Sequence, residues 1–332
     1  MLRSWALAWL FVGAVGTVVC AVMVGPRGTW SSLRPDDEVE ARIVTEVRLP
    51  RVALGFLAGA ALATAGMAFQ ALFRNALATP YTLGVSAGAS LGAAIYVHTG
   101  ISASLVGIPG HVVAALAGAA ASIALVYAVA QASVGFSSSA LLLTGVAVSF
   151  LCTSIILAIQ YVGDVTTSFR IGRWLLGGLE VVGFVPVFHL LPFAVIGIGI
   201  LLAISRELDL LAIGEESAAA RGVPVSAVKQ MVFAAASLMV GGVVATCGPI
   251  GFVGLVVPHI GRIVLGPRHR TLGPFSVLAG GTFLVACDAL GRTVVAPVEI
   301  PVGIITALVG GPFFLAMLVQ GHANHRITGG RA

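Results

Sequence analysis

The residue types that carry out covalent chemistry in enzymes do not occur in catalytic arrangements in this chain. An ATP-binding phosphate loop needs the pattern G-x-x-x-x-G-K-[ST], in which backbone amides and a lysine hold the phosphates. The chain has a single lysine, Lys229, and no glycine directly precedes it. Zinc motifs and paired catalytic carboxylates are also absent from the sequence. The sequence therefore predicts no catalytic residues, and if ATP drives this protein, another chain must bind it.

Histidine and cysteine, which most often ligate transition metals, are scattered along the chain. The four cysteines lie far apart inside apolar runs, which predicts buried, unreactive thiols. The histidines lack ligand spacing, and only His322 and His325 stand three residues apart, in a polar tail. We therefore expect no metal site and no cofactor bound by this chain.

Charged groups inside the apolar runs are the remaining candidates for chemistry. Carriers that work alone on an ion gradient usually keep ionisable side chains at mid-membrane. Asp288 is the only clear carboxylate within such a run, and Arg292 follows four residues later. That spacing predicts an ion pair within one helix. The absence of a further relay argues against an ion-coupled carrier.

The composition identifies the elements that must position these residues. Of 332 residues, 58% are hydrophobic and 9% are charged, whereas a soluble domain carries about 25% charged residues. The 42 glycines are typical of closely packed membrane helices. The net charge of +5 comes from basic residues at the ends of apolar runs, so nucleic-acid binding is not indicated. We predict an all-α polytopic membrane protein that forms a single transmembrane domain over residues 1–332.

Apolar runs long enough to span a bilayer, which takes about 20 residues in a helix, occur about ten times. We interpret the first run as a transmembrane helix rather than a signal peptide, because no convincing cleavage site follows it. Lysine and arginine favour the cytoplasmic side, and ten of these residues against eight place the N-terminus there. The predicted spans are 6–24, 51–73, 82–98, 110–131, 139–161, 185–204, 230–247, 250–265, 274–291 and 301–320.

Three of the connections between the predicted spans are rich in polar and charged residues, namely 26–50, 162–180 and 205–229. In the third, leucines alternate with acids, and a strong helix-forming stretch from Glu215 ends at Gly222. We predict short helices outside the membrane in this connection. An ordinary solvated loop is the alternative.

Several motifs occur in one order along nearly the whole chain. Together they resemble the permease subunits of type II ABC importers, which take up ferric siderophores, haem and cobalamin. Ala76 departs from the family pattern, which has proline after the asparagine. The motifs are Arg48-Leu-Pro-Arg51, Gly59 to Gly66, Gln70 to Leu77, Pro80-Tyr-Thr-Leu-Gly-Val-Ser86, Trp174-Leu-Leu-Gly-Gly178, Gly214 to Val223, Gly248 to Arg262, Glu299 to Gly303 and Gly310 to Phe314.

The resemblance implies that the connection 205–229 forms coupling helices, which sit in a groove of a separate ATP- and Mg-using ATPase. The predicted contact residues are Gly214, Glu215, Glu216, Ala218, Ala219, Arg221 and Gly222.

The resemblance further implies that arginines on the outer face dock a periplasmic or lipid-anchored binding protein through salt bridges. The matching positions are Arg48, Arg51 and Arg292. Anchoring of helix ends at the membrane interface is the alternative role for these side chains.

The family's pathway lies between two copies of the permease and is lined mainly by the fifth and tenth spans. Predicted gate residues are Asn75 and Leu77, with Ser138 and Ser139, although these serines could equally cap a helix. Thr144 and Ser149 are predicted to line the pathway.

These observations predict an importer permease in the bacterial inner membrane, working as a homodimer with two ATPases. By family frequency, the expected cargo is a ferric siderophore first, then haem, then cobalamin. The main alternative is an ion-coupled carrier that needs no ATPase. An intramembrane enzyme lacks a catalytic constellation, and a non-transporting scaffold leaves the ordered motifs unexplained.

Overall fold

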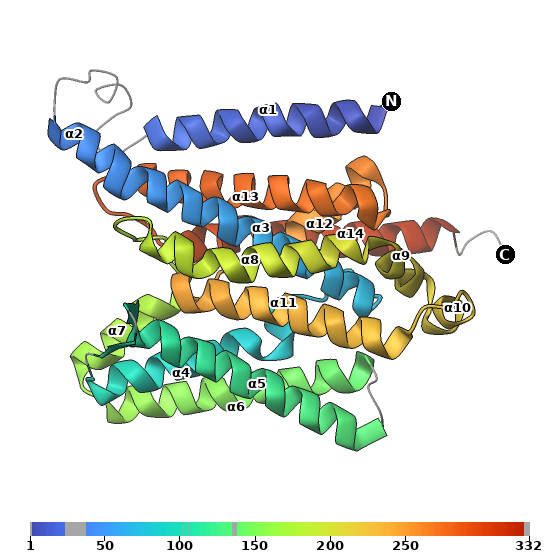
Figure 1. The fold of residues 1–332 in the computed structure, drawn as a ribbon, viewed down its shortest axis with the longest axis horizontal. Coiled ribbons are helices and arrows are strands. Elements are labelled where there is room, and N and C mark those ends of the chain that lie inside the picture. The colour runs from blue at the N-terminus through green and yellow to red at the C-terminus, as the bar shows by residue number, and fades with distance from the viewer. Residues whose placement is uncertain (1, 24–37, 102, 106, 135–137, 329–332) are drawn as a thin grey trace.

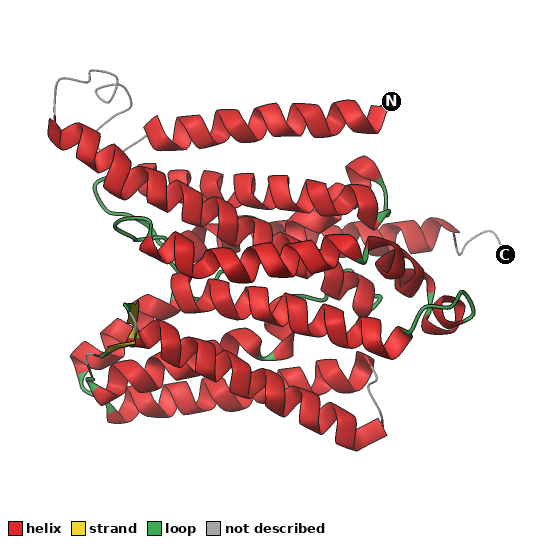
Figure 2. Ribbon diagram, viewed as in Figure 1, coloured by secondary structure: helices red, strands yellow, loops and turns green. Residues whose placement is uncertain are grey.

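A computed structural model describes residues 2–23, 38–101, 103–105, 107–134 and 138–328. The described residues are almost entirely helical and form one bundle (Figures 1 and 2). The first half of the chain contains α1 (Leu2–Met23), α2 (Glu38–Arg42), the π-helix η2 (Ile43–Arg48), α3 (Leu49–Leu72), the 3-10 helix η3 (Pro80–Leu83), α4 (Val85–Thr99), β1 (Ser104–Leu105), β2 (Ile108–Pro109), α5 (Gly110–Val134) and α6 (Ser138–Val162). The second half contains α7 (Val165–Leu175), α8 (Val185–Ala203), α9 (Ser205–Ile213), α10 (Glu215–Ala219), α11 (Val225–Cys247), α12 (Val253–Leu265), α13 (His269–Thr293) and α14 (Val302–Thr328).

A helix corresponds to each predicted span, but the helices differ in length. Among the described residues, six helices are long and apolar enough to cross a membrane: Ile43–Leu72, Gly110–Ala132, Ser139–Val162, Val185–Ala203, Val225–Cys247 and His269–Thr293. The runs at 82–98 and 250–265 form the shorter helices α4 and α12, of 15 and 13 residues. At the start of α4, Pro80 begins a separate 3-10 turn, and Gly84 takes a left-handed conformation that breaks the helix there.

Two of the predicted polar connections are more helical than the sequence indicated. Helical structure begins at Glu38 and continues through η2 into α3. The connection 162–180 contains α7, whose first turn is capped by the Asp164 carboxylate accepting a hydrogen bond from the Thr167 amide at 2.9 Å. A short cap followed by threonines is a weak helix signal, which explains why the sequence did not predict α7.

Helix α3 lies at the centre of the bundle. It packs against α8, α11, α12 and α13, while α4, α5 and α6 form a neighbouring layer and α1 lies outside against α13 (Figure 1). Small residues allow the closest crossings. A Cβ added to Gly66 on α3 would lie 2.0 Å from the Gly254 carbonyl oxygen on α12. The backbones of α3 and α12 therefore touch, as small residues permit in membrane helices.

We expect Gly66→Val to separate α3 from α12 and to destabilise the fold by more than the roughly 1–3 kcal/mol of ordinary overpacking, because backbone atoms must move. The readout is the thermal midpoint of the detergent-solubilised protein. Gly199→Val is the matched control, because a Cβ at Gly199 on α8 meets no atom within 4 Å. Equal midpoints for the two variants would contradict the tight crossing.

Candidate functional site

The two short helices α9 and α10 lie together at one end of the bundle (Figure 1). The N-terminal end of α1 and the C-terminal end of α14 lie at this same end. The prediction of short helices within 205–229 is thus confirmed. The predicted connection extended five residues too far, because residues 225–229 already belong to α11. We call this end of the bundle the coupling end.

Most of the predicted contact residues of the coupling end reach its surface. Glu216, Ala219, Arg221 and Gly222 are exposed, while Gly214 and Glu215 are half-buried. Ala218 is an exception, because it is fully buried in the main hydrophobic core. Its small side chain allows α10 to lie flat on the bundle, so it packs internally and offers no surface to a partner.

An ion pair joins α10 to α11. The Nζ of Lys229 lies 3.0 Å from both carboxylate oxygens of Glu215. The lysine side chain is only 4% exposed, whereas that of Glu215 is 37% exposed. Sequence reasoning predicted Glu215 but missed its partner, although a single lysine in 332 residues was a signal. This ion pair therefore links α10 directly to the long helix α11.

A second polar contact joins α9 to the first residue of α13. Oδ1 of Asp209 accepts a hydrogen bond from the His269 backbone amide at 2.8 Å and lies 2.7 Å from His269 Nδ1. Burial opposes ionisation of the Asp209 carboxyl, but the contacts with His269 outweigh it and hold the pKa of Asp209 below its usual value. Sixty residues separate the partners, so no local pattern could predict this contact.

The lowered pKa of Asp209 predicts a pH-dependent contribution to stability. A carboxyl with a depressed pKa stabilises the fold above its unfolded pKa of about 3.9, and this contribution is lost as the pH falls through the folded pKa. We expect Asp209→Asn to lower the free energy of unfolding by about 1 kcal/mol at pH 7. The difference from wild type should shrink as the pH approaches 3. Thermal midpoints at both pH values test this, and a deficit that is unchanged at pH 3 would contradict it.

The predicted gate residues lie between this end and the bundle core. Asn75 closes a turn in which its Oδ1 accepts the Leu77 amide at 2.9 Å. This loop leads into η3, which packs against α6. Ser138 is the first residue of α6 and its side chain lies outside the described part, while Ser139 is exposed. The loop that contains Asn75 and Leu77 therefore leads to a turn that contacts α6, the helix that begins at Ser138.

The predicted pathway residues lie along α6. Thr144 and Ser149 are half-buried, and the Ser149 hydroxyl donates to the Gly145 carbonyl of its own helix at 2.8 Å. The gating and pathway roles of all these residues remain predictions.

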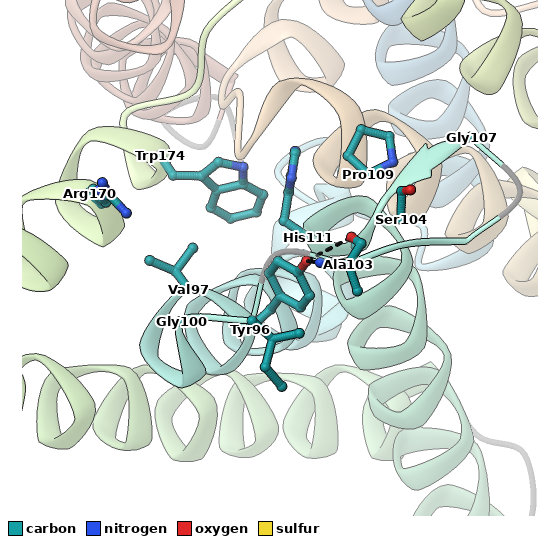
Figure 3. A pocket seen from close by; sticks show the side chains of 12 residues that line it. Tyr96, Val97, Gly100, Ala103, Ser104, Gly107, Pro109, His111, Arg170 and Trp174 are labelled. Carbon is teal, nitrogen blue, oxygen red and sulfur yellow. Dashed lines mark hydrogen bonds between the residues drawn. The ribbon is translucent and has the colours of Figure 1, made fainter.

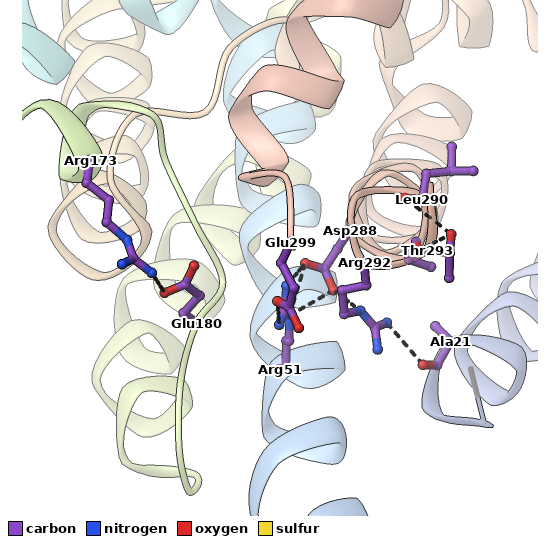
Figure 4. Close-up of polar contacts among 10 residues, drawn as sticks. Ala21, Arg51, Arg173, Glu180, Asp288, Leu290, Arg292, Thr293 and Glu299 are labelled. Carbon is purple, nitrogen blue, oxygen red and sulfur yellow. Dashed lines mark hydrogen bonds and ion pairs between the residues drawn. The ribbon is translucent and has the colours of Figure 1, made fainter. Parts of the chain in front are cut away.

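At the opposite end of the bundle, which we call the outer end, four charged side chains form one network (Figure 4). Arg51 on α3 donates hydrogen bonds of 2.8 and 3.0 Å to the Asp288 carboxylate on α13. It also donates one of 2.6 Å to the Glu299 carboxylate. Arg292 lies 3.1 Å from Asp288, which confirms the predicted pair within α13. Arg292 also donates to the Ala21 carbonyl of α1 at 3.1 Å. Two cations and two anions leave the network with no net charge.

This network changes the expectation for the docking arginines. Arg51 and Arg292 are 8% and 3% exposed, and both interact with carboxylates of the same chain. Both side chains are thus buried and paired within the chain, and their role in docking a binding protein remains a prediction. Arg48 is half-buried and donates to the Val22 and Met23 carbonyls at 3.3 and 3.4 Å. The network instead fixes the relative positions of α1, α3 and α13.

Metal-ligating side chains do not gather in the part of the chain that the structure describes. Within it, no three His, Cys, Asp or Glu residues lie close enough to hold an ion. Neither the coupling end nor the outer network therefore offers a cradle for a resident metal among these residues.

Comparison with known proteins decides the family. Residues 7–320 match the model of the FecCD transport family. The chain belongs to this family. The FecCD match covers the motifs from which the resemblance was inferred, and the prediction of a permease of the type II ABC importer family is confirmed. The chain is accordingly a multi-pass membrane protein.

Individual relatives support the FecCD assignment over most of the chain. The uncharacterized ABC transporter permease protein YvrB of Bacillus subtilis is 43% identical, covering 80% of this chain and 75% of YvrB. The cobalamin import system permease BtuC of Halobacterium salinarum is 42% identical, covering 75% of this chain and 66% of that protein. A solved metal-chelate type ABC transporter in an inward-facing conformation aligns with a TM-score of 0.87 at 30% identity, covering 96% of this chain and 99% of the solved chain.

Proposed function

We propose that two copies of this permease form the pathway of an ABC importer that carries a metal chelate across a bacterial inner membrane. Two ATPase subunits bind at the coupling ends, and a binding protein delivers cargo to the outer ends. The observation that carries the proposal is the coupling end itself. There, exposed side chains of α10 and the following turn lie beside a half-buried ion pair that joins α10 to α11.

A coupling function explains why the coupling end is built from charged side chains. Closure of the ATPases moves α9 and α10, and the contacts Glu215–Lys229 and Asp209–His269 pass this movement to α11 and α13. A third contact, in which Arg262 on α12 donates to the side chain of Gln70 on α3, lies deeper in the bundle. Each contact crosses between two elements, so the helices respond together. The permease itself makes and breaks no covalent bond.

An ion-coupled carrier is the rival function, and the outer network argues against it. A coupling carboxylate must change protonation or ion occupancy during transport. Asp288 instead receives two hydrogen bonds from the Arg51 Nη2 and Nε groups to Oδ1, and it also lies beside Arg292. Two guanidinium groups of the same chain thus occupy this carboxylate, which leaves it little room to bind a transported cation.

The names of the relatives support a proposal for the class of cargo that this permease carries. One relative is named for cobalamin import and the solved transporter is of metal-chelate type. A metal held inside a chelator is the chemistry common to both. We keep a ferric siderophore as the first expected cargo, followed by haem and cobalamin.

Assembly with an ATPase tests the proposal at the coupling end. The permease is co-expressed with its candidate ATPase, and native mass spectrometry of the purified complex gives its subunit composition. We expect two permeases with two ATPases, and we expect Glu216→Arg to remove the ATPases while the permease remains folded. Glu38→Arg at the outer end is the control, because Glu38 is equally exposed but distant. Retention of the ATPases by Glu216→Arg would reject the assigned docking face.

A further inference from the structure

Two neighbouring cavities open at the outer end, with volumes of about 580 and 320 Å³. Both are lined by His111 at the start of α5 and by Arg170 and Trp174 on α7 (Figure 3). Tyr96 on α4 lines the larger cavity, and Arg173 with Glu180 lines the smaller one. We call this shared space the outer cleft. Its size lies within the range of roughly 300–1,000 Å³ that is usual for pockets binding small molecules.

The charges that line the outer cleft leave a positive excess. Arg173 donates to Glu180 at 2.7 Å, so these two charges cancel. Glu180 is the only carboxylate among the described lining residues, and none of those residues forms an ion pair with Arg170. Arg170 is exposed, and it also interacts electrostatically with Asp164, which lies six residues earlier in the chain. The Arg170 guanidinium is thus available to an anion inside the cleft.

Aromatic side chains supply the rest of the cleft wall. Figure 3 shows the ring of Trp174 beside Arg170, facing the same space as His111. The Tyr96 hydroxyl is occupied, because it donates to the Ala103 carbonyl and accepts the Ala103 amide, both at 2.8 Å. Tyr96 therefore fixes the loop that leads to the β1–β2 hairpin, and its ring forms apolar wall. An arginine beside a flat aromatic surface suits an anion attached to an apolar or planar body.

The outer cleft also reaches the start of α14, which corresponds to the tenth predicted span. Its smaller cavity reaches Thr246 and Cys247 at the end of α11 and Pro301, which directly precedes α14. The smaller cavity thus joins α7, the end of α11 and the residue before α14, and α7 lies at the end of the bundle opposite α9 and α10 (Figure 1). A molecule in the cleft would stand at the outer entrance of the bundle.

We propose that the outer cleft binds a carboxylate-bearing metal chelate, with Arg170 holding a carboxylate and Trp174 covering the chelator body. This inference rests on the proposed function and narrows its cargo to anionic chelates. A guanidinium binds a carboxylate through two parallel N–H···O bonds, which a neutral hydroxamate chelate does not offer. The cleft therefore discriminates by charge as well as by size.

Direct binding tests the outer cleft without ATP or any partner. The permease in lipid nanodiscs is dialysed to equilibrium against radiolabelled ferric citrate and, separately, against ferrichrome, a neutral ferric hydroxamate. We expect tighter binding of ferric citrate, and we expect Arg170→Gln to weaken it about tenfold while changing ferrichrome binding less than twofold. Arg170→Lys should keep part of the affinity, because it retains the charge but loses the bidentate geometry.

Arg206→Gln is the matched control, since Arg206 is exposed at the coupling end and should leave binding unchanged. Thermal midpoints identify any variant that fails to fold. If Arg170→Gln does not fold, the binding of ferric citrate by Arg170→Lys is compared with that by wild type instead. Equal binding of ferric citrate by wild type and Arg170→Gln, or no binding by wild type, would overturn the proposed site. Transport that fails while this binding persists would reject the importer function and keep the site, so the two failures are distinguishable.

Discussion

Replacing Lys229 with methionine is expected to lower ATP-driven uptake about tenfold while the protein stays folded in the membrane. The substitution leaves Glu215 half-buried without its cation. Breaking a buried pair costs about 3–5 kcal/mol, and the 37% exposure of Glu215 reduces this to about 1–2 kcal/mol. That amount weakens the contact between α10 and α11 by a factor of about 5 to 30. Movement of the ATPase then no longer reaches the membrane helices.

A double-mutant cycle separates lost coupling from lost folding. Adding Glu215→Gln to Lys229→Met removes the carboxylate that has lost this lysine, so part of the uptake should return. Arg42→Met is the control, because Arg42 is 72% exposed and its contact with Glu38 is 3.9 Å long. ATP hydrolysis by the complex should persist in Lys229→Met, which would show that the energy source is intact but disconnected. Normal uptake by Lys229→Met would show that the ion pair does not transmit force.

The second large effect is expected at the outer network. Arg51→Met should destabilise the protein by about 3–5 kcal/mol, because it leaves Asp288 and Glu299 competing for Arg292 in a site with little water. The side chain of Asp288 is only 4% exposed, so solvent cannot replace the lost guanidinium. Thermal unfolding in detergent, followed by the midpoint temperature, measures the loss.

Two variants sharpen this prediction. Arg173→Met breaks a pair of the same kind at 2.7 Å, but both partners are more than half exposed, so the expected loss is below about 1 kcal/mol. Adding Glu299→Gln to Arg51→Met restores electrical neutrality and leaves the pair of Asp288 with Arg292, so stability should partly recover. Similar midpoints for Arg51→Met and Arg173→Met would contradict the burial argument.

The sequence predicted the fold well wherever a local pattern determines structure. Long apolar runs could only be helices in lipid, because every backbone amide must be bonded within the segment. The pair of Asp288 with Arg292 followed from four-residue helical spacing, and the structure places them 3.1 Å apart. The acid-rich stretch near Glu215 and its glycine stop predicted the helices of the coupling end for the same reason.

The features that the sequence did not predict depend on contacts between segments that are far apart in the chain. Arg51 and Asp288 are 237 residues apart, so nothing local showed that the arginine turns inward rather than toward a docking partner. Ala218 was chosen for its size, but only the packing of α10 shows that its small side chain faces the core. The outer cleft draws on α4, α5 and α7 together, and nothing local in the sequence places Tyr96 and His111 beside the arginine and tryptophan of α7.

Uptake in proteoliposomes tests the central claim most directly. The permease is reconstituted with its candidate ATPase and binding protein, and entry of labelled ferric siderophore, haem and cobalamin is followed with and without ATP. We predict that one chelate accumulates only when ATP, the ATPase and the binding protein are all present. Accumulation driven by an ion gradient in liposomes that contain the permease alone would contradict the account.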